Sequence, residues 1–202
     1  MNIVLLSLLA PGRAFRKLTG LKRPLRRALL LVVVCGLAYA LTSLLLGAAG
    51  AIPMAGVFLP VEVENYYFWQ MIFALPAVLF TWAGASLVLR LADRPERTSF
   101  RETLSQAGLA VAAPLFLAWI PSAVEAVLMT LGMGQEEYVG IISPPGVWQS
   151  LYISVYCLAV LYLLVLMTTA AWKGGKSARA RRLSAGLAAA FFAAAVFILL
   201  IR

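Results

Sequence analysis

A chain of 202 residues in which 63% are hydrophobic and only 12% are charged is too apolar for a soluble domain, where about 25% of residues carry charge. The net charge of +9 could indicate a nucleic-acid partner. The basic residues flank long apolar segments, however, so anionic lipid headgroups account for them more simply. We therefore expect one integral membrane protein domain, with anionic lipids and no nucleic acid among its partners.

Residues 1–27 form the first predicted unit, a basic segment on the cytoplasmic side. Its apolar run Ile3–Ala10 precedes its cations, which is the reverse of a signal peptide. Phe15, Leu18 and Leu25 fall near one face, which predicts one or two short helices lying on the cytoplasmic leaflet. A flexible basic tail that only fixes the topology is the alternative. The cations expected to contact lipid headgroups here are Arg13, Arg16, Lys17, Lys22, Arg23, Arg26 and Arg27.

Residues 28–202 are predicted to form a five-span membrane domain. A helix rises about 1.5 Å per residue and needs about 20 apolar residues to cross the hydrocarbon core. Spanning β-strands would give short alternating segments, so we expect an all-α, polytopic membrane bundle of five transmembrane helices with a short N-terminal interfacial helical segment. The charge-free segments that predict the spans are Ala28–Gly50, Tyr66–Leu89, Thr103–Val124, Gly146–Trp172 and Leu183–Ile201.

Apart from Arg202 at the end of the sequence, basic residues recur only at the ends of the second and fourth spans and in the stretches that follow them. The two intervening loops carry acids instead, Glu62 with Glu64 and then Glu136 with Glu137. Because Lys and Arg are retained on the cytoplasmic side, we predict a cytoplasmic N-terminus and an external C-terminus, in a bacterial inner membrane. The third basic group is also expected to contact lipid headgroups, and it consists of Lys173, Lys176, Arg179, Arg181 and Arg182.

The third predicted span is unusual in its prolines. Ser99 and Glu102 form a capping-box pattern ahead of it. Pro114 and Pro121 then lie seven residues apart inside it, and each removes a backbone N–H from the helix. Pro76 does the same in the second span. A bent packing helix is the favoured interpretation, and a helix lining a substrate path is the alternative.

Glu125 is the acid nearest to a predicted span. It lies about 22 residues beyond the inner end of the third span, so a rise of 1.5 Å per residue places it near the outer interface. We expect a solvated and dispensable carboxylate there. The alternative is a functional carboxylate, since ionisable groups inside membranes usually serve function.

Few residues of the sequence carry catalytic chemistry. It contains no His, which removes His-based catalysis and His-containing metal sites. Cys35 and Cys157 lie in different spans with no ligand spacing around them, and no phosphate-binding loop is present. We therefore expect no catalytic, cofactor-binding or metal-binding residues, and the protein is not expected to be an enzyme.

Small residues at helical spacing predict close contact between helices. They occur in Trp82–Ser86, in Ala107 and Gly108 with Ala112, and in Gly186 with Ala190 and Ala194. Such faces can also contact a second copy of the chain or another membrane protein.

Two blocks of the sequence resemble bacterial Yip-domain proteins. One is Leu9-Ala10-Pro11 with Phe15 and Leu18, and the other runs from Ser99-Phe100 to Ile120-Pro121. The five-span layout is similar as well. The resemblance implies an all-α membrane protein without catalytic residues. Eukaryotic members interact with Rab-type GTPases through a long N-terminal region with a DLYGP-like segment, which this chain lacks, so that interaction is not expected.

Two functions follow from these observations. The first is a non-enzymatic, membrane-organising or scaffold protein that contacts lipids and partners. The alternative is a small transporter or channel subunit whose third span and Glu125 line the path. Polar residues at the predicted mid-membrane depth are few, namely Thr42, Thr81, Ser86 and Ser154. This scarcity favours the first function, because a polar path usually needs more such groups.

Overall fold

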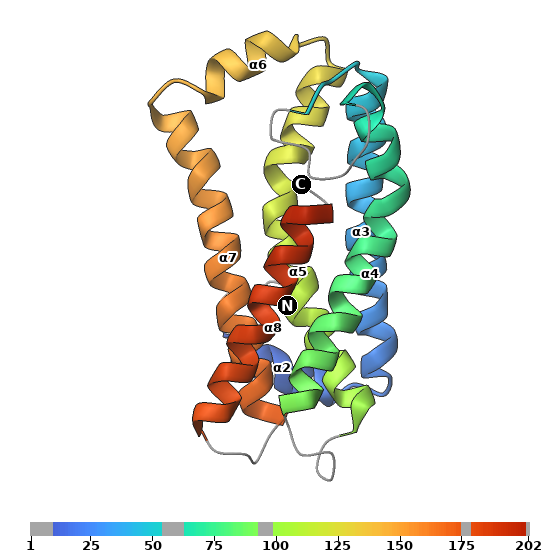
Figure 1. Ribbon diagram of the computed structural model, residues 1–202, viewed down its shortest axis with the longest axis vertical. Coiled ribbons are helices and arrows are strands. Elements are labelled where there is room, and N and C mark those ends of the chain that lie inside the picture. Colours follow the sequence, from blue (N-terminus) through green and yellow to red (C-terminus); the bar gives the residue numbers. More distant parts are fainter. Residues whose placement is uncertain (1–9, 54–62, 93–98, 175–178, 201–202) are drawn as a thin grey trace.

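The computed structural model describes residues 10–53, 63–92, 99–174 and 179–200 (Figure 1). These residues form an all-α bundle with no strand among them, which confirms the predicted fold class. The elements are α2 (Pro11–Thr19), α3 (Pro24–Ala48), the 3-10 helix η1 (Val63–Asn65), α4 (Tyr66–Ala92), α5 (Phe100–Thr130), α6 (Gln135–Ile142), α7 (Val147–Gly174) and α8 (Arg179–Leu200).

Five of these helices, α3, α4, α5, α7 and α8, are long and apolar enough to cross a membrane, as predicted. Their ends differ from the predicted ones where charge was taken as a boundary. α3 begins at Pro24, because proline fits the first turn of a helix. α5 begins at the capping box, in which the Ser99 side chain accepts from the backbone N–H of Glu102 at 3.3 Å. α5 continues to Thr130, six residues beyond the predicted end.

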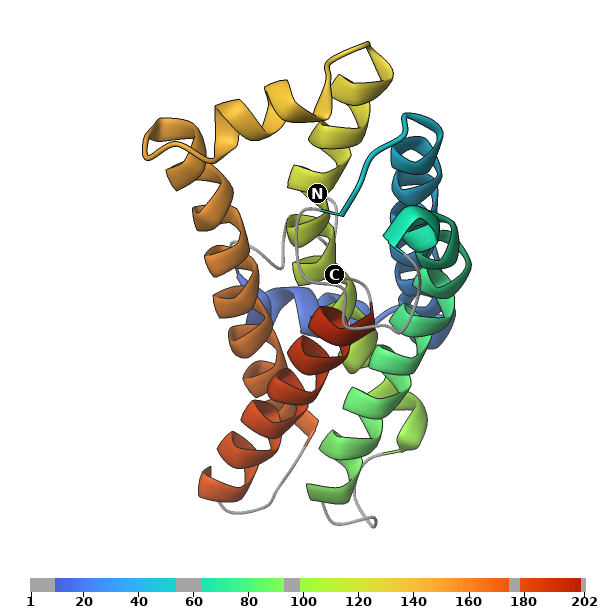
Figure 2. The ribbon, with the colours of Figure 1, turned by 45° about the horizontal axis from the view of Figure 1, so that its top comes forward.

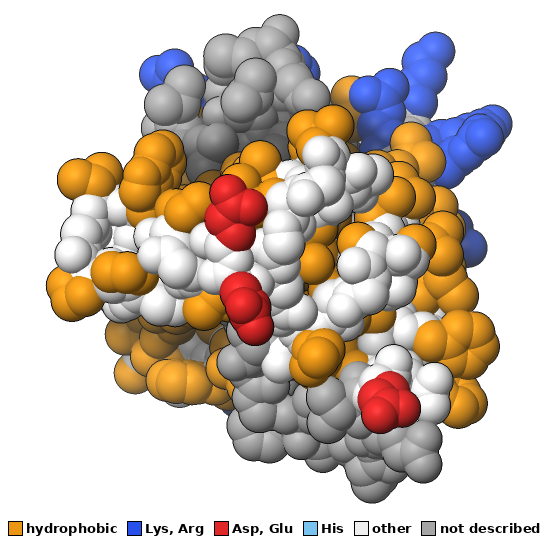
Figure 3. All heavy atoms as spheres, turned by 90° about the horizontal axis from the view of Figure 1, so that it is seen from above, with side chains coloured by type: hydrophobic (Ala, Val, Ile, Leu, Met, Phe, Trp, Pro, Cys, Tyr) orange, Lys and Arg blue, Asp and Glu red, His pale blue; other side chains and the backbone are white. Residues whose placement is uncertain are grey.

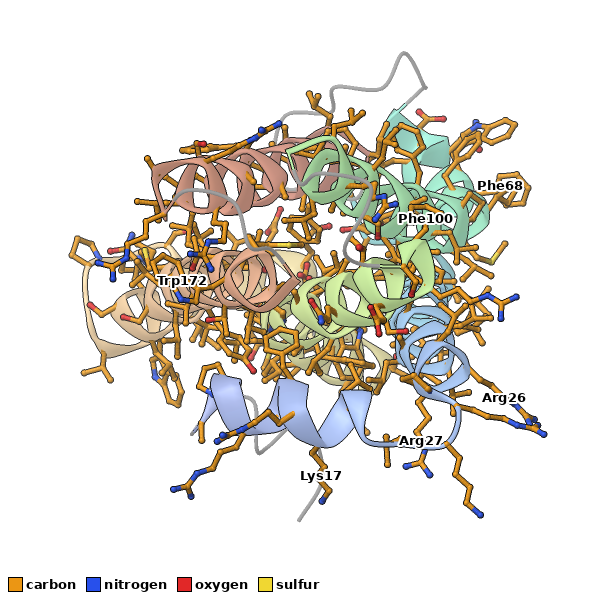
Figure 4. All side chains as sticks on the ribbon, turned by 90° about the horizontal axis from the view of Figure 1, so that it is seen from below. Lys17, Arg26, Arg27, Phe68, Phe100 and Trp172 are labelled. Carbon is orange, nitrogen blue, oxygen red and sulfur yellow. The ribbon has the colours of Figure 1, made fainter. Side chains whose placement is uncertain are left out.

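The five long helices enclose a common core. α3 packs against α4 and α5, α4 packs against α8, and α7 packs against α5 and α8. α2 lies against the flank of α5 and α7 near one end of the bundle (Figure 4), and α6 lies across the other end between the tops of α5 and α7 (Figures 1 and 2). α8 is the shortest of the five and its C-terminal end stops well below α6 (Figure 1).

The two ends of the bundle differ in charge. The end with α6, here called the acidic end, exposes Glu64, Glu136 and Glu137, and acidic side chains are visible on this face in Figure 3. The opposite end, here called the basic end, carries α2, whose Lys17 extends away from the bundle together with Arg26 and Arg27 (Figure 4). Apart from Glu102 in the first turn of α5, the exposed acidic groups of the described residues lie at the acidic end, and the basic groups lie at the other end, as the sequence predicts.

α2 contacts protein through its apolar face. Phe15 and Leu18 are fully buried in the main core, against α5 and α7. The expectation that these two side chains lie in the lipid leaflet is therefore wrong, because α5 and α7 offer them an apolar surface. Leu25 is half-buried and belongs to the first turn of α3. The cations Arg13, Arg16 and Lys17 remain exposed, as headgroup contact requires.

The third basic group is only partly described. Arg179 and Arg181 are exposed, whereas the side chains of Lys173 and Lys176 lie outside the described residues. Arg182 differs from both, because its guanidinium lies 4.7 Å from the centre of the Trp172 ring and donates to the Trp172 carbonyl at 3.3 Å. This side chain is thus engaged within the protein.

Glycines mark the closest helix contacts. A Cβ atom at Gly36 would lie 2.7 Å from the Leu75 side chain, one at Gly108 would lie 2.7 Å from the Ala28 Cβ, and one at Gly186 would lie 2.6 Å from the Thr168 Cα. The small-residue faces predicted from the sequence are therefore used between helices of the same chain. Contact of such faces with a partner stays a prediction.

Replacing Gly186 with Ala should destabilise the bundle by about 1–3 kcal/mol, because the new methyl group meets the backbone of α7 and the helices must separate. Gly140→Ala in α6 is the matched control, since a Cβ there meets nothing within 4 Å. Unfolding of the full chain in mixed micelles measures both. Equal midpoints for the two variants would contradict the close α7–α8 contact.

Candidate ligand-binding cavity

A cavity of about 630 Å³ lies in the half of the bundle nearest the acidic end. We call it the polar cavity. Side chains from α3 to α8 form its wall, and this size is typical of sites for small molecules. Its polar lining residues are Tyr39, Thr42, Ser43, Tyr66, Tyr67, Gln70, Ser122, Glu125, Ser143, Gln149 and Tyr152.

Hydrogen bonds tie the α3 and α4 sides of the polar cavity together. The Ser43 hydroxyl lies 2.9 Å from Gln70 Oε1, to which it donates, and Gln70 Nε2 donates to the Tyr66 hydroxyl at 3.2 Å. The Tyr39 hydroxyl donates to the Leu115 carbonyl of α5 at 3.0 Å. These bonds hold the polar wall in one arrangement before any ligand arrives.

The α5 side of the polar cavity carries its charge. Glu125 is only 5% exposed and lines the cavity together with Ser122, one helical turn earlier. The expectation of a solvated carboxylate at the rim is therefore wrong. α5 does not end at Val124, and Glu125 lies five residues before Thr130, so about 7.5 Å below the helix end. α3 packs against α5, and residues of α3, α4, α6 and α7 line the cavity together with Glu125.

α6 forms the roof of the polar cavity through Val139 and Ile142. The chain turns from α5 towards α6 at Gly132, whose φ of +101° favours glycine over every other residue. At its start, Gln135 Oε1 accepts from the backbone N–H of Ile52 at 2.8 Å, which links the roof to the end of α3. Beyond its end, Gln149 Nε2 donates to the Ser143 carbonyl at 2.9 Å.

A second cavity of about 280 Å³ lies nearer the middle of the bundle, among α4, α5, α7 and α8. We call it the apolar cavity. Thr81 and Tyr156 are its polar lining residues among the described ones, and the others are apolar. Phe197 of α8 lines both cavities. Its ring packs edge-on against the ring of Tyr39, with centroids 5.8 Å apart, so this aromatic pair stands between them.

The positions of the prolines bear on the two predicted roles of α5, a packing helix and a helix that lines a path. α5 is one uninterrupted helix that contains both Pro114 and Pro121. Both are buried, and Pro114 lines the apolar cavity. Pro76 of α4 is exposed on the surface of the bundle and lines neither cavity. α5 is thus both a packing helix and a wall of the two cavities, whereas Pro76 is not part of the site.

Most of the cavity residues are not apparent in the sequence as a site. Tyr39, Thr42, Ser43 and Leu46 recur at spacings of three and four, so they share one face of α3. Gln149, Tyr152 and Ile153 do the same on α7. Such periodic polar residues inside apolar spans, all in the half nearest the acidic loops, are the signal that could have predicted the cavity.

The described polar groups of the cavity wall are one carboxylate with several hydroxyls and amides. No group of three or more His, Cys, Asp or Glu side chains that could hold a metal ion occurs among the described residues. Cys35 is buried in the core and Cys157 is exposed on the surface of the bundle. Comparisons with protein-family models, curated proteins and solved structures found no match to this chain.

Proposed function

We propose that this integral membrane protein binds a small ligand with a cationic group in the polar cavity, as a non-enzymatic transporter or channel-type protein. The observation that carries the proposal is Glu125, a carboxylate that is buried in the wall of a cavity and belongs to a helix long and apolar enough to span a membrane. A carboxylate in such a place commonly serves as the counter-ion of a ligand or of a transported ion. Cation binding offsets the cost of burying its charge.

Two further features of the polar cavity support a cation. Among its described lining residues, none is Lys or Arg, and Glu125 is the one carboxylate. Four of the lining residues are tyrosines, Tyr39, Tyr66, Tyr67 and Tyr152. The faces of aromatic rings attract organic cations, and quaternary ammonium groups in particular. A carboxylate with several tyrosines therefore favours an organic cation over a metal ion.

Tetramethylammonium tests this function with the full chain in neutral detergent. Isothermal titration should show saturable binding with one cation per chain. The matched control is the exposed Glu136→Gln variant at the acidic end, which should bind as the unchanged protein does. The absence of saturable heat, or equal heat from a neutral molecule of the same shape, would contradict a cation site.

A second candidate function is membrane organisation through the basic end. It is favoured by the exposed Arg13, Arg16 and Lys17 on the outer face of α2, next to Arg26 and Arg27 (Figure 4). Each cation near an anionic leaflet contributes about 1 kcal/mol, and Arg can bind a phosphate through two hydrogen bonds. Binding of anionic lipids by this end is compatible with a ligand cavity in the other half.

Reversing three charges of α2, with Arg13, Arg16 and Lys17 replaced by Glu, should lower the share of anionic phospholipid that copurifies with the full chain. Mass spectrometry of the extracted lipid measures that share. Glu136→Lys and Glu137→Lys at the acidic end are the control and should not lower it. An unchanged lipid composition in the α2 variant would leave the cations as topology signals alone.

We also propose that the basic end faces the cytoplasm of a bacterial cell, because Lys and Arg are retained on that side. Single cysteines test this after Cys35 and Cys157 are replaced with Ala. A membrane-impermeant maleimide added to intact cells should label Glu136→Cys and should not label Arg179→Cys. The reverse pattern would invert the topology. Membership of the Yip-domain family is a further proposal, which rests on the two sequence blocks and the five-span layout.

A further inference from the structure

The polar and apolar cavities follow one another along the same face of α7. Tyr152 lines the polar cavity, and Tyr156, one turn further on, lines the apolar cavity. Their rings pack edge-on with centroids 5.1 Å apart. On the opposite side, Phe197 of α8 belongs to both walls. The two cavities are therefore neighbours, with aromatic rings at their boundary.

Each cavity is lined by apolar side chains that are also exposed on the outside of the bundle. Ile153 lines the polar cavity and is 52% exposed, while Val160 and Ile198 line the apolar cavity and are about half exposed. In a bilayer, these exposed apolar side chains face lipid chains. Lipid chains therefore lie directly against the outer side of both cavity walls.

The chemistry of the combined site changes along its length. Its end nearest α6 holds Glu125 and the tyrosines, and its other end holds Ala159, Leu163 and Ala193. A soluble cation would use only the first part. A ligand that matches both parts has a positive headgroup joined to an apolar chain. A phosphate beside the headgroup would meet the Glu125 carboxylate with no Lys or Arg among the described lining residues to balance it.

We infer that the ligand is a single-chain cationic amphiphile, such as a long-chain amine or quaternary ammonium compound. Its headgroup binds beside Glu125 and its chain passes Phe197 into the apolar cavity. The volume of the apolar cavity, about 280 Å³, favours a single chain over two. This inference rests on the proposed cation site and adds the apolar half of the ligand.

The test compares dodecyltrimethylammonium with tetramethylammonium, two probes that share a headgroup. Binding of each radiolabelled probe to the full chain in neutral nanodiscs is measured after subtraction of empty nanodiscs. The long-chain probe should bind at least about 10-fold more tightly at the protein, and each probe should compete with the other. If both bind equally, the apolar cavity takes no chain and the inference is overturned, while the cation site remains. If neither binds saturably, the proposed function falls as well.

A variant that fills the apolar cavity separates the two parts of the site. Ala159→Phe places a ring at a buried wall position of the apolar cavity and should lower the affinity for the long-chain probe at least about 10-fold more than the affinity for tetramethylammonium. Ala194→Leu, at a half-buried wall position, is the milder second variant if Ala159→Phe fails to fold. A chain-length advantage that survives in the folded variant would place the chain in the bilayer and overturn the inference.

Discussion

Replacing Glu125 with Gln should lower the affinity for a cationic ligand by about 30-fold or more. Removal of one partner of a buried charge pair costs about 2–5 kcal/mol, and each 1.4 kcal/mol corresponds to a tenfold change in affinity. The amide retains the size of the carboxylate but not its charge, so the loss reports the charge itself. Titration of tetramethylammonium into the full chain measures the effect.

The same substitution should leave the stability of the unliganded bundle equal or raise it. Burying a carboxylate among transmembrane helices costs free energy, and a neutral isostere avoids that cost. A residue whose replacement weakens binding and strengthens the fold serves function at the expense of stability. Glu125→Asp keeps the charge and should retain part of the affinity. If Glu125→Gln instead lowered the unfolding midpoint and left binding intact, the carboxylate would be a packing residue.

Replacing Phe15 with Ala should destabilise the protein by about 3–5 kcal/mol, the usual cost of removing a fully buried ring. The ring of Phe15 is packed into the main core, so its loss opens a cavity where α2 contacts α5 and α7. Lys17→Ala on the exposed face of the same helix is the control and should change stability by no more than about 0.5 kcal/mol.

Unfolding of the two variants in mixed micelles shows whether the apolar face of α2 packs against α5 and α7 or lies among lipid chains. A ring that lay among lipid chains would exchange lipid contacts for other lipid contacts, and its truncation would cost little. A small effect of Phe15→Ala, similar to that of Lys17→Ala, would therefore contradict the packing of α2 against the bundle.

The five spans could be predicted because they depend on properties local in the sequence. Runs of apolar residues fix the helices, and charges at their ends fix which ends lie together. The capping box at Ser99 was predictable for the same reason, since both of its partners lie within three residues. The predicted helix end at Val124 is wrong. Glu125 ends the charge-free run there, but the following residues continue the apolar helix to Thr130.

The site could not be predicted in the same way, because its residues meet only in the folded bundle. Ser43 and Gln70 are hydrogen-bonded across 27 positions, and the Tyr39 hydroxyl reaches a carbonyl 76 positions away. The few polar residues at the predicted mid-membrane depth do not indicate the site, because most of its polar groups lie nearer the acidic end. The burial of Glu125 likewise depends on neighbouring helices, and no local pattern of the sequence predicts it.

The glycine contacts and the ligand cavity occupy different stretches of the same helices. Along α3, Ala28 and Gly36 make the close contacts and Tyr39 and Ser43 follow. Along α7, Tyr152 lines the cavity and Thr168 meets Gly186 far below it. Substitutions in the cavity wall can therefore change its shape and polarity without touching the glycine contacts that hold the other half of the bundle together.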